Sequence, residues 1–350
     1  MRKLFPWRAS ACLCAVAAAA LAGCGGVPTQ PGSAQPAYPG GARGSTRIPP
    51  PAPPLLYVSD QSTGNIYVWN WNTLGAVPGD EITGLFTKPY GQCVDSQGDV
   101  YISDYATGNT LEFARGATTP RNTYAYPGAG SGAAIGCSVD SRGDLAVSYY
   151  STSGNANAPQ GELAVWPGGG GTSYQYTSTS CYNMWPPGFD HSGNLIVQGT
   201  TSSGTPEICE LPAGGTSLST LTLSGGTINS PGSVMWDGQY IALTDQKAHP
   251  FKTGIYRTTL SGTSLTVVGA ETILRDTCIL VHHNSMLAQP FIVGTTNTPG
   301  TSSIGTKIVG GDLTCTTGKV ALWHYTGGLA PYNSATPAPL LPYGQSVSFH

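Results

Sequence analysis

Charged side chains are scarce in this sequence. Lys, Arg, Asp and Glu make up 9% of its 350 residues, against about 25% in an ordinary soluble domain. The 15 basic and 18 acidic residues give a formal net charge of −3, and no run of Lys or Arg occurs. Because a nucleic-acid binder gathers positive charge on one face or along one segment, we expect no nucleic acid among the partners.

The composition also excludes long-helix and coiled-coil proteins. Such chains draw about half of their residues from Ala, Glu, Lys, Leu and Arg, whereas this one contains 48 Gly and 28 Pro. Hydrophobic residues still make up 39% of the chain, enough for a core. The figures fit an all-β chain of short strands and many turns.

Motifs of catalysis are missing too. The six His residues form no metal-ligand spacing, and no Gly-x-Ser-x-Gly elbow occurs. The run Gly168-Gly169-Gly170-Gly171 is followed by no helical pattern, so we interpret it as a loop between strands and not as a phosphate loop. We therefore assign no catalytic residue, no metal ligand and no cofactor.

The N-terminus carries the most specific motif. Arg2, Lys3 and Arg8 precede an apolar stretch over residues 9–21 that is too short to span a bilayer. The stretch ends in Leu21-Ala22-Gly23-Cys24, which resembles the lipobox of bacterial lipoproteins. The resemblance implies that residues 1–23 are a signal peptide and that Cys24 becomes lipidated with acyl chains such as palmitate. The alternative is an ordinary secretory signal with an incidental cysteine.

Residues 24–54 form a predicted tether between this anchor and a domain over residues 55–350. The tether is rich in Gly, Pro, Ala, Ser and Gln and ends in Pro49-Pro50-Pro51-Ala52-Pro53-Pro54, so it cannot bury a core. Two or more acyl chains would hold it stably on a membrane. Gly25 follows the cysteine instead of Asp, which by the same resemblance favours the outer membrane, with the domain periplasmic or surface-exposed.

A repeat predicts the fold of that domain. An apolar strand, an Asp-x-x-Gly-Asp hinge and a second strand occur at residues 89–104 and again at 136–149. Shortened or degenerate copies follow at 189–197, 235–245 and 278–288. Asp bonds the backbone two residues on and Gly adopts the positive φ of a tight turn, so the hinge predicts a hairpin.

The spacing of the copies is typical of a β-propeller. The second strands are predicted to end at intervals of 44, 45, 50, 46 and 45 residues, each followed by a third strand. This matches four-stranded propeller blades. We predict six blades, with a long insertion in the sixth around residues 293–311. The predicted second strands end at Asp60, Asp104, Tyr149, Gly199, Asp245 and Pro290.

The first blade lacks an inner strand of its own, and the chain's end supplies one. Pro342-Tyr343-Gly344-Gln345-Ser346-Val347 repeats Pro89-Tyr90-Gly91-Gln92-Cys93-Val94 almost letter for letter. We predict that the C-terminal strand enters blade 1 as its innermost strand and closes the ring. Closure would protect strand edges that an open array leaves free to pair.

These repeats resemble the NHL-repeat family of six-bladed propellers and, more loosely, the gluconolactonase-like and strictosidine-synthase-like propellers. The gluconolactonase-like resemblance implies a metal held by Glu, Asn and Asp at the channel mouth. Among the residues that begin the predicted inner strands, only Asp276 is a carboxylate. Hinge residues such as Asp95 and Asp140, and Asp60, Asp104 and Asp245 at strand ends, are predicted to stabilise turns, with cation binding by the latter three as the alternative.

Six cysteines remain after the leader and Cys24. In an oxidising compartment they permit up to three disulfides in fifteen connectivities. Within single predicted blades, Cys278–Cys315 and Cys181–Cys209 are the candidate pairs. Cys93, Cys137 and Cys278 lie on or beside inner strands, where free buried thiols are also common.

Aromatic residues supply the candidate ligand-binding surface. Packing between blades is one role for them, and the alternative is a mouth lined by rings and hydroxyls that holds a neutral ligand. We therefore expect a lipid-anchored, non-catalytic module that binds a protein or a glycan, with a metal-dependent lactonase or lyase as the alternative. The residues predicted to face a ligand are Tyr90, Tyr149, Tyr150, Tyr182 and Trp185.

Overall fold

The computed structural model shows an all-β unit within Pro50–His350. Short 3-10 turns at Trp71–Thr73 and Pro167–Gly169 interrupt the strands. In the described part of the chain no helix is long and apolar enough to cross a membrane. The structure describes residues 52–74, 78–128, 132–150, 161–249, 252–275, 291–293, 307–312, 319–327, 333–335 and 342–349.

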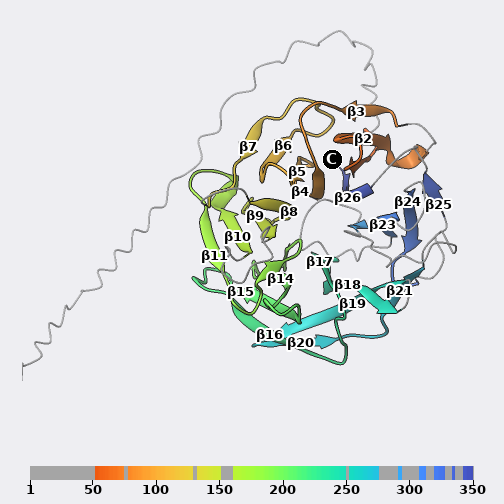
Figure 1. Cartoon of the computed structure of the whole chain (residues 1–350). Helices are drawn as coiled ribbons and strands as arrows, with labels where there is room; N and C mark the ends of the chain where they lie inside the picture. Colours follow the sequence, from red (N-terminus) through yellow and green to blue (C-terminus); the bar gives the residue numbers. More distant parts are fainter. Residues whose placement is uncertain are drawn as a thin grey trace, which may run out of the picture. The chain divides into compact units, whose positions relative to one another are not determined.

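Three antiparallel sheets of four strands make up the first half of the domain (Figure 1). In each of them, strands that follow one another in the chain lie side by side, except that the C-terminal strand joins the first sheet. The first sheet contains β26 (Pro342–Ser348), β1 (Leu55–Asp60), β2 (Asn65–Asn70) and β3 (Asp80–Ile82). The second contains β4 (Pro89–Val94), β5 (Val100–Asp104), β6 (Thr110–Phe113) and β7 (Asn122–Tyr124). The third contains β8 (Ala133–Val139), β9 (Leu145–Tyr150), β10 (Glu162–Trp166) and β11 (Tyr174–Thr177).

A larger sheet and a further four-stranded sheet make up the rest of the described domain. The larger sheet begins with β12 (Asn183–Met184), β13 (Gly188–Phe189), β14 (Leu195–Thr200), β15 (Pro206–Leu211) and β16 (Ser219–Ser224). It continues with β17 (Pro231–Trp236), β18 (Ile241–His249), β19 (Lys252–Ser261), β20 (Ser264–Val267) and β21 (Thr272–Arg275). The further sheet contains β22 (Phe291–Val293), β23 (Lys307–Asp312), β24 (Lys319–His324) and β25 (Asn333–Ala335).

The repeated hinge folds as the sequence predicts. In the second sheet, Asp95 Oδ1 accepts hydrogen bonds from the backbone N–H groups of Gln97 and Asp99, both at 2.9 Å. Gly98 takes a φ of 86°, and Gly143 takes 85° in the next copy of the hinge. Since only glycine adopts such angles without strain, the Asp-x-x-Gly-Asp pattern fixes the hairpin between the first and second strands of each copy.

The second strands form the core because neighbouring sheets cover them on both sides. All five residues of β5 are buried, and so are the last five of β1. The outer strand β16, by contrast, buries only Leu221 fully. A strand covered on both faces reads as a continuous apolar run, which explains why these segments were the clearest in the sequence.

Neighbouring sheets pack through their inner strands, namely the innermost strands β26, β4 and β8 and the second strand β23 of the last sheet. Contacts run from β26 to β4, from β4 to β8 and from β23 back to β26, and Figure 1 shows β26 (blue) beside β4. Glycine permits this approach, since a Cβ atom on Gly344 would lie 1.9 Å from the carbonyl oxygen of Tyr90. The C-terminal strand pairs with β1 in antiparallel register, with Leu56 opposite Val347.

Two features differ from the sequence prediction. The segments predicted as the fourth and fifth blades share one ten-stranded sheet, because β16 pairs in parallel with β20 and Leu223 lies opposite Leu265. The strand β19 is ten residues long and carries β20 on one half and β21 on the other. The outer edge of β20 is then free to form backbone hydrogen bonds with the outer edge of β16.

The second difference lies in the last predicted blade. The strand β23 (Lys307–Asp312) falls mostly inside the segment interpreted as an insertion, and it pairs along its whole length with β24. Its sequence contains Gly310 and Gly311 and follows no Asp-x-x-Gly-Asp hinge, so it lacked the signal that marked the other second strands. Pro290, the predicted end of that strand, lies outside the described residues.

Candidate functional site: an aromatic cluster at one end of the strands

The aspartates at the ends of the second strands hold loops in place. Asp104 accepts hydrogen bonds from the backbone N–H groups of Thr87 and Lys88 at 2.9 Å, and Asp245 accepts from Asn229 and Ser230 in the same way. Their carboxylates are thereby committed to turns. Among the described residues, no group of three or more His, Cys, Asp or Glu side chains could hold a metal ion. Asp276 lies outside the described residues.

Five aromatic side chains gather at the end of the strands where these aspartates lie. We call them the aromatic cluster: Tyr90, Tyr105, Tyr150, Trp185 and Tyr343. The ring of Tyr90 lies 4.7 Å from that of Tyr343 and 5.8 Å from that of Tyr105. Trp185 meets Tyr150 edge-on at 5.5 Å. Each of the five side chains is partly exposed, so the cluster forms part of the surface.

The repeat explains why these rings converge. Tyr90 and Tyr343 are the second residues of β4 and β26, two innermost strands that pack on each other. Tyr105 follows the last residue of β5, and Tyr150 is the last residue of β9. Equivalent positions in successive sheets therefore deliver aromatic side chains to one end of the domain.

The cluster consists of four phenols and one indole and contains no carboxylate, Lys, Arg or His. Burial raises the pKa of Tyr90 above its usual value, and the neighbouring phenols of Tyr343, Tyr105 and Tyr150 raise it further. Burial also raises the pKa values of Tyr343 and Tyr150, and for Tyr150 the phenol of Tyr105 adds to the effect. The surface therefore offers ring faces and neutral hydroxyl groups, which suit stacking and hydrogen bonding.

Three of the five residues predicted to face a ligand lie in this cluster, namely Tyr90, Tyr150 and Trp185. Tyr149 is 1% exposed and packs on Tyr126 at 4.7 Å, because consecutive residues of a strand point to opposite faces. Tyr182 is also buried.

Two members of the cluster were missed. The near-identity of Pro342-Tyr343-Gly344 with Pro89-Tyr90-Gly91 marked the equivalence of Tyr343 with Tyr90 and could have identified it. Tyr105 could have been identified from its place directly after the strand end at Asp104.

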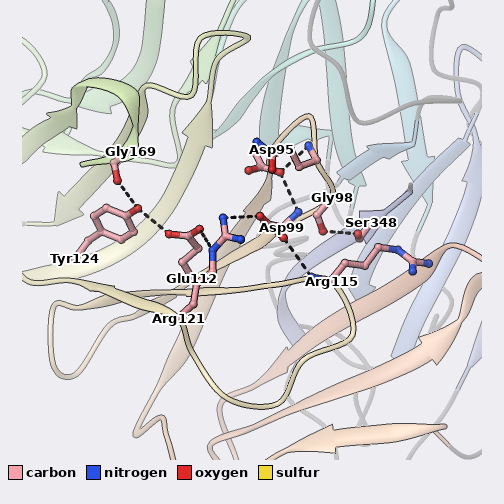
Figure 2. A network of polar contacts seen from close by, with 10 residues as sticks. Asp95, Gly98, Asp99, Glu112, Arg115, Arg121, Tyr124, Gly169 and Ser348 are labelled. Atoms are coloured by element: carbon pink, nitrogen blue, oxygen red, sulfur yellow. Dashed lines mark hydrogen bonds and ion pairs between the residues drawn. The ribbon is translucent and has the colours of Figure 1, made fainter. Parts of the chain in front are cut away.

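At the other end of the strands, a polar network holds the second sheet to its neighbours (Figure 2). The Arg121 guanidinium lies 2.5 Å from Glu112 and 2.6 Å from Asp99. The Tyr124 hydroxyl donates to Glu112 Oε2 at 2.8 Å and to the carbonyl oxygen of Gly169, in the turn between β10 and β11, at 2.7 Å. Burial and the hydrogen bond to Glu112 raise the pKa of Tyr124 to about 12.

The same network reaches the first sheet. The Ser348 hydroxyl on β26 donates to the carbonyl oxygen of Gly98 at 2.5 Å, and the backbone N–H of Gly116 donates to the Tyr57 hydroxyl at 2.7 Å. Each charged side chain that Figure 2 labels has a partner within the protein, and the Arg115 guanidinium donates to the carbonyl oxygen of Pro53. The network is therefore a connection between sheets and not an open binding site.

Two disulfide bonds occur in the described part of the chain. Cys181 is joined to Cys209, one of the two pairs suggested by the sequence. Cys93 on β4 is joined to Cys137 on β8, so this bond links two neighbouring sheets. The sequence left both of these cysteines without a predicted partner, because the pairing spans two copies of the repeat. Cys24, Cys278 and Cys315 lie outside the described residues.

Comparison with known proteins places the fold. No known family profile matches the chain, and no curated protein matches it. A chain of the nidogen/laminin complex superposes with a TM-score of 0.58 at 16% identity, covering 85% of this chain and 98% of that one. A protein of unknown function from Bacteroides caccae gives 0.55 at 13% identity, covering 85% and 99%. A functionally unknown protein from Desulfotomaculum acetoxidans DSM 771 gives 0.51 at 10% identity, with the same coverage.

The fold is therefore that of a β-propeller built from a sequence repeat. The likeness extends over nearly the full length of each similar chain. At identities of 10–16%, this likeness supports the fold and gives no information about function.

Proposed function

We propose that this chain is a lipid-anchored, extracytoplasmic β-propeller of six blades that binds a protein or a carbohydrate without catalysing a reaction. The observation that carries the proposal is the aromatic cluster. Five partly exposed rings from five different strands or strand ends meet on one surface, with ring separations of 4.7–5.8 Å where they contact. Exposed aromatic groups that lie together on a rigid scaffold are typical of binding surfaces.

The chemistry of the cluster suits a neutral ligand. Ring faces stack on sugar rings or on apolar side chains, and phenol hydroxyls donate and accept hydrogen bonds at the edges. The phenols of Tyr90, Tyr150 and Tyr343 are neutral at physiological pH, and burial raises their pKa values further above it. No observation among the described residues favours the lactonase or lyase alternative.

Six blades and closure of the ring by the C-terminal strand are part of the proposal. The repeat spacing near 46 residues supports the blade count. The pairing of β26 with β1 and the packing of β23 on β26 support closure. In this interpretation the pairing of β16 with β20 joins two adjacent blades by their outer edges.

The envelope location is proposed from the leader, the tether and the disulfides. Leu21-Ala22-Gly23-Cys24 resembles a lipobox, and disulfide bonds persist mainly in oxidising compartments. Metabolic labelling with an alkyne fatty acid tests the anchor. We expect label on the full-length chain and none on the Cys24→Ser variant, and an unlabelled wild type would refute lipidation at this residue.

Ligand-observed NMR tests the binding proposal. A panel of neutral oligosaccharides and short peptides is screened for saturation transfer from the full chain and from its Trp185→Ala variant. Tyr174→Ala is the control, because Tyr174 is 60% exposed on the outer strand β11 and lies outside the cluster. We expect at least one compound whose signal falls with Trp185→Ala and persists with Tyr174→Ala. A panel with no compound that behaves in this way contradicts the proposal.

A further inference from the structure

A second site lies at the end of the strands opposite to the aromatic cluster. A cavity of about 390 Å³ opens between the hinge of β13 and β14 and the strands β15, β17 and β19. Its lining contains two carboxylates and an aromatic pair but no Lys or Arg. The lining residues used below are Asp190, His191, Glu210, Trp236, Gln239 and Thr259.

Glu210 is the unusual member of this lining. It is 7% exposed, and the structure gives its carboxylate no hydrogen bond or ion pair with any described residue. Burial and the nearby Asp190 raise its pKa. The Asp190 carboxylate is itself committed to the hinge, where it accepts from the backbone N–H groups of Ser192 and Asn194 at 2.8 and 2.9 Å. The Glu210 oxygens are not among the fully enclosed polar atoms that lack a partner, and the side chain lines the cavity, so a ligand there can reach the carboxylate.

The second sheet shows how the same position is satisfied by the protein. Glu112 lies opposite Tyr101, the second residue of β5, and Glu210 lies opposite Ile196, the second residue of β14. The two glutamates are therefore equivalent in the repeat. Glu112, however, is held by the Arg121 guanidinium and the Tyr124 hydroxyl (Figure 2).

Both partners are absent from the copy that contains Glu210. Glu112 pairs with Asn122 and Thr110 with Tyr124, while Glu210 pairs with Ser219 and Ile208 with Leu221. The register thus puts Leu218 at the position of Arg121 and Leu221 at the position of Tyr124. Leu221 is buried and Leu218 packs against a hydrophobic cluster, so neither side chain can neutralise the glutamate. The cation that Glu112 finds in the second sheet is therefore missing beside Glu210.

We propose that this cavity binds an arginine side chain of a partner protein, whose guanidinium pairs with Glu210 as that of Arg121 pairs with Glu112. The ring of His191 lies 5.0 Å from that of Trp236 in the cavity wall, and a guanidinium stacks on such aromatic surfaces. Gln239 and Thr259 add polar groups around it. The site shares no residue with the aromatic cluster, so the two binding proposals can be tested and refuted separately.

The test uses the full chain and N-acetyl-L-arginine N-methylamide as the probe. Binding is followed by the shift of the Trp236 indole NMR signal, assigned with a Trp236→Phe variant. We expect a saturable shift that weakens about tenfold or more in Glu210→Gln, since a charge-assisted hydrogen bond is lost. Glu207→Gln, which removes the same charge from β15 outside the cavity, should leave binding unchanged. The citrulline analogue, alike in shape but neutral, should bind at least tenfold more weakly.

A second variant tests the equivalence with the second sheet directly. Leu218→Arg introduces the counterpart of Arg121. We expect the new guanidinium to pair with the Glu210 carboxylate and to abolish the shift caused by the probe. Equal binding of the citrulline analogue, equal binding by Glu210→Gln, or no saturable shift in the wild type would overturn the proposal. Saturable binding of spermidine with none of the arginine probe would overturn it in favour of a free polyamine.

Discussion

The ring of Tyr343 on the last strand lies 4.7 Å from that of Tyr90, its equivalent in the sequence repeat. The two residues are separated by most of the domain's chain, yet β26 packs directly on β4. The proposed binding surface therefore depends on the placement of the C-terminal strand. Fold and function are coupled at this contact.

Deleting residues 343–350 should destabilise the whole domain. The deletion removes nearly all of β26, including the buried Val347 opposite Leu56, and uncovers the edge of β1. We expect the melting temperature to fall by about ten degrees or more, since each kcal/mol is worth roughly 2–4 °C in a domain of this size. Differential scanning calorimetry measures this, with deletion of His350 alone as the control. An unchanged melting temperature would show that β26 does not support the fold.

Gly344→Ala should be far more harmful than Gly170→Ala. A Cβ atom on Gly344 would lie 1.9 Å from the carbonyl oxygen of Tyr90, whereas one on Gly170 would meet no atom within 4 Å. We expect Gly344→Ala to lower the free energy of unfolding by about 2 kcal/mol or more, through displacement of two packed strands. Gly170→Ala should change it by less than about 0.5 kcal/mol. Urea denaturation compares the two, and equal effects would contradict the close approach of β26 and β4.

Each disulfide bond should stabilise the domain, and the contribution of each can be measured separately. The bonds Cys93–Cys137 and Cys181–Cys209 close loops of 44 and 28 residues, for which the chain-entropy relation gives roughly 3.5–4 kcal/mol each. Peptide mapping under non-reducing conditions should recover both bonds from the mature protein. The double variants Cys93→Ala/Cys137→Ala and Cys181→Ala/Cys209→Ala should each melt below the wild type. Recovery of free thiols at all four positions would contradict the pairing.

Glu162 should make stability depend on pH. It is buried, its Oε1 atom has no hydrogen-bond partner, and burial raises its pKa above the ordinary 4.5. A raised folded-state pKa means that the stability it contributes is complete below about 4.5 and is lost as pH rises through the folded value. Glu162→Gln should therefore melt above the wild type at pH 7 and close to it at pH 4. A melting-temperature difference that does not grow with pH, or one equal to that of the control Glu207→Gln, would contradict this assignment.

The sequence predicted the repeated parts of the fold because their signals are local. The end of β5 falls at Asp104, as predicted, and β9, β14 and β18 extend one or more residues past the predicted ends at Tyr149, Gly199 and Asp245. An Asp-x-x-Gly-Asp hinge and a buried apolar run suffice for this, since both act within a few residues. The propeller class followed from the period of these signals.

Two features that depend on contacts between copies of the repeat were not predicted. The Cys93–Cys137 bond joins two sheets, and the β16–β20 pairing depends on the length of β19. Within the candidate site, Tyr90, Tyr150 and Trp185 were identified from composition and position. Tyr149 was included wrongly because the face of β9 toward the core cannot be assigned when both faces carry tyrosine.

Calorimetric titration of a ligand found by the NMR screen tests the central claim most directly. The dissociation constant is measured for the wild type, Trp185→Ala and Tyr174→Ala. If the aromatic cluster is the binding surface, loss of Trp185 weakens binding about tenfold or more and loss of the exposed Tyr174 leaves it unchanged. Equal dissociation constants for the wild type and Trp185→Ala would contradict the account.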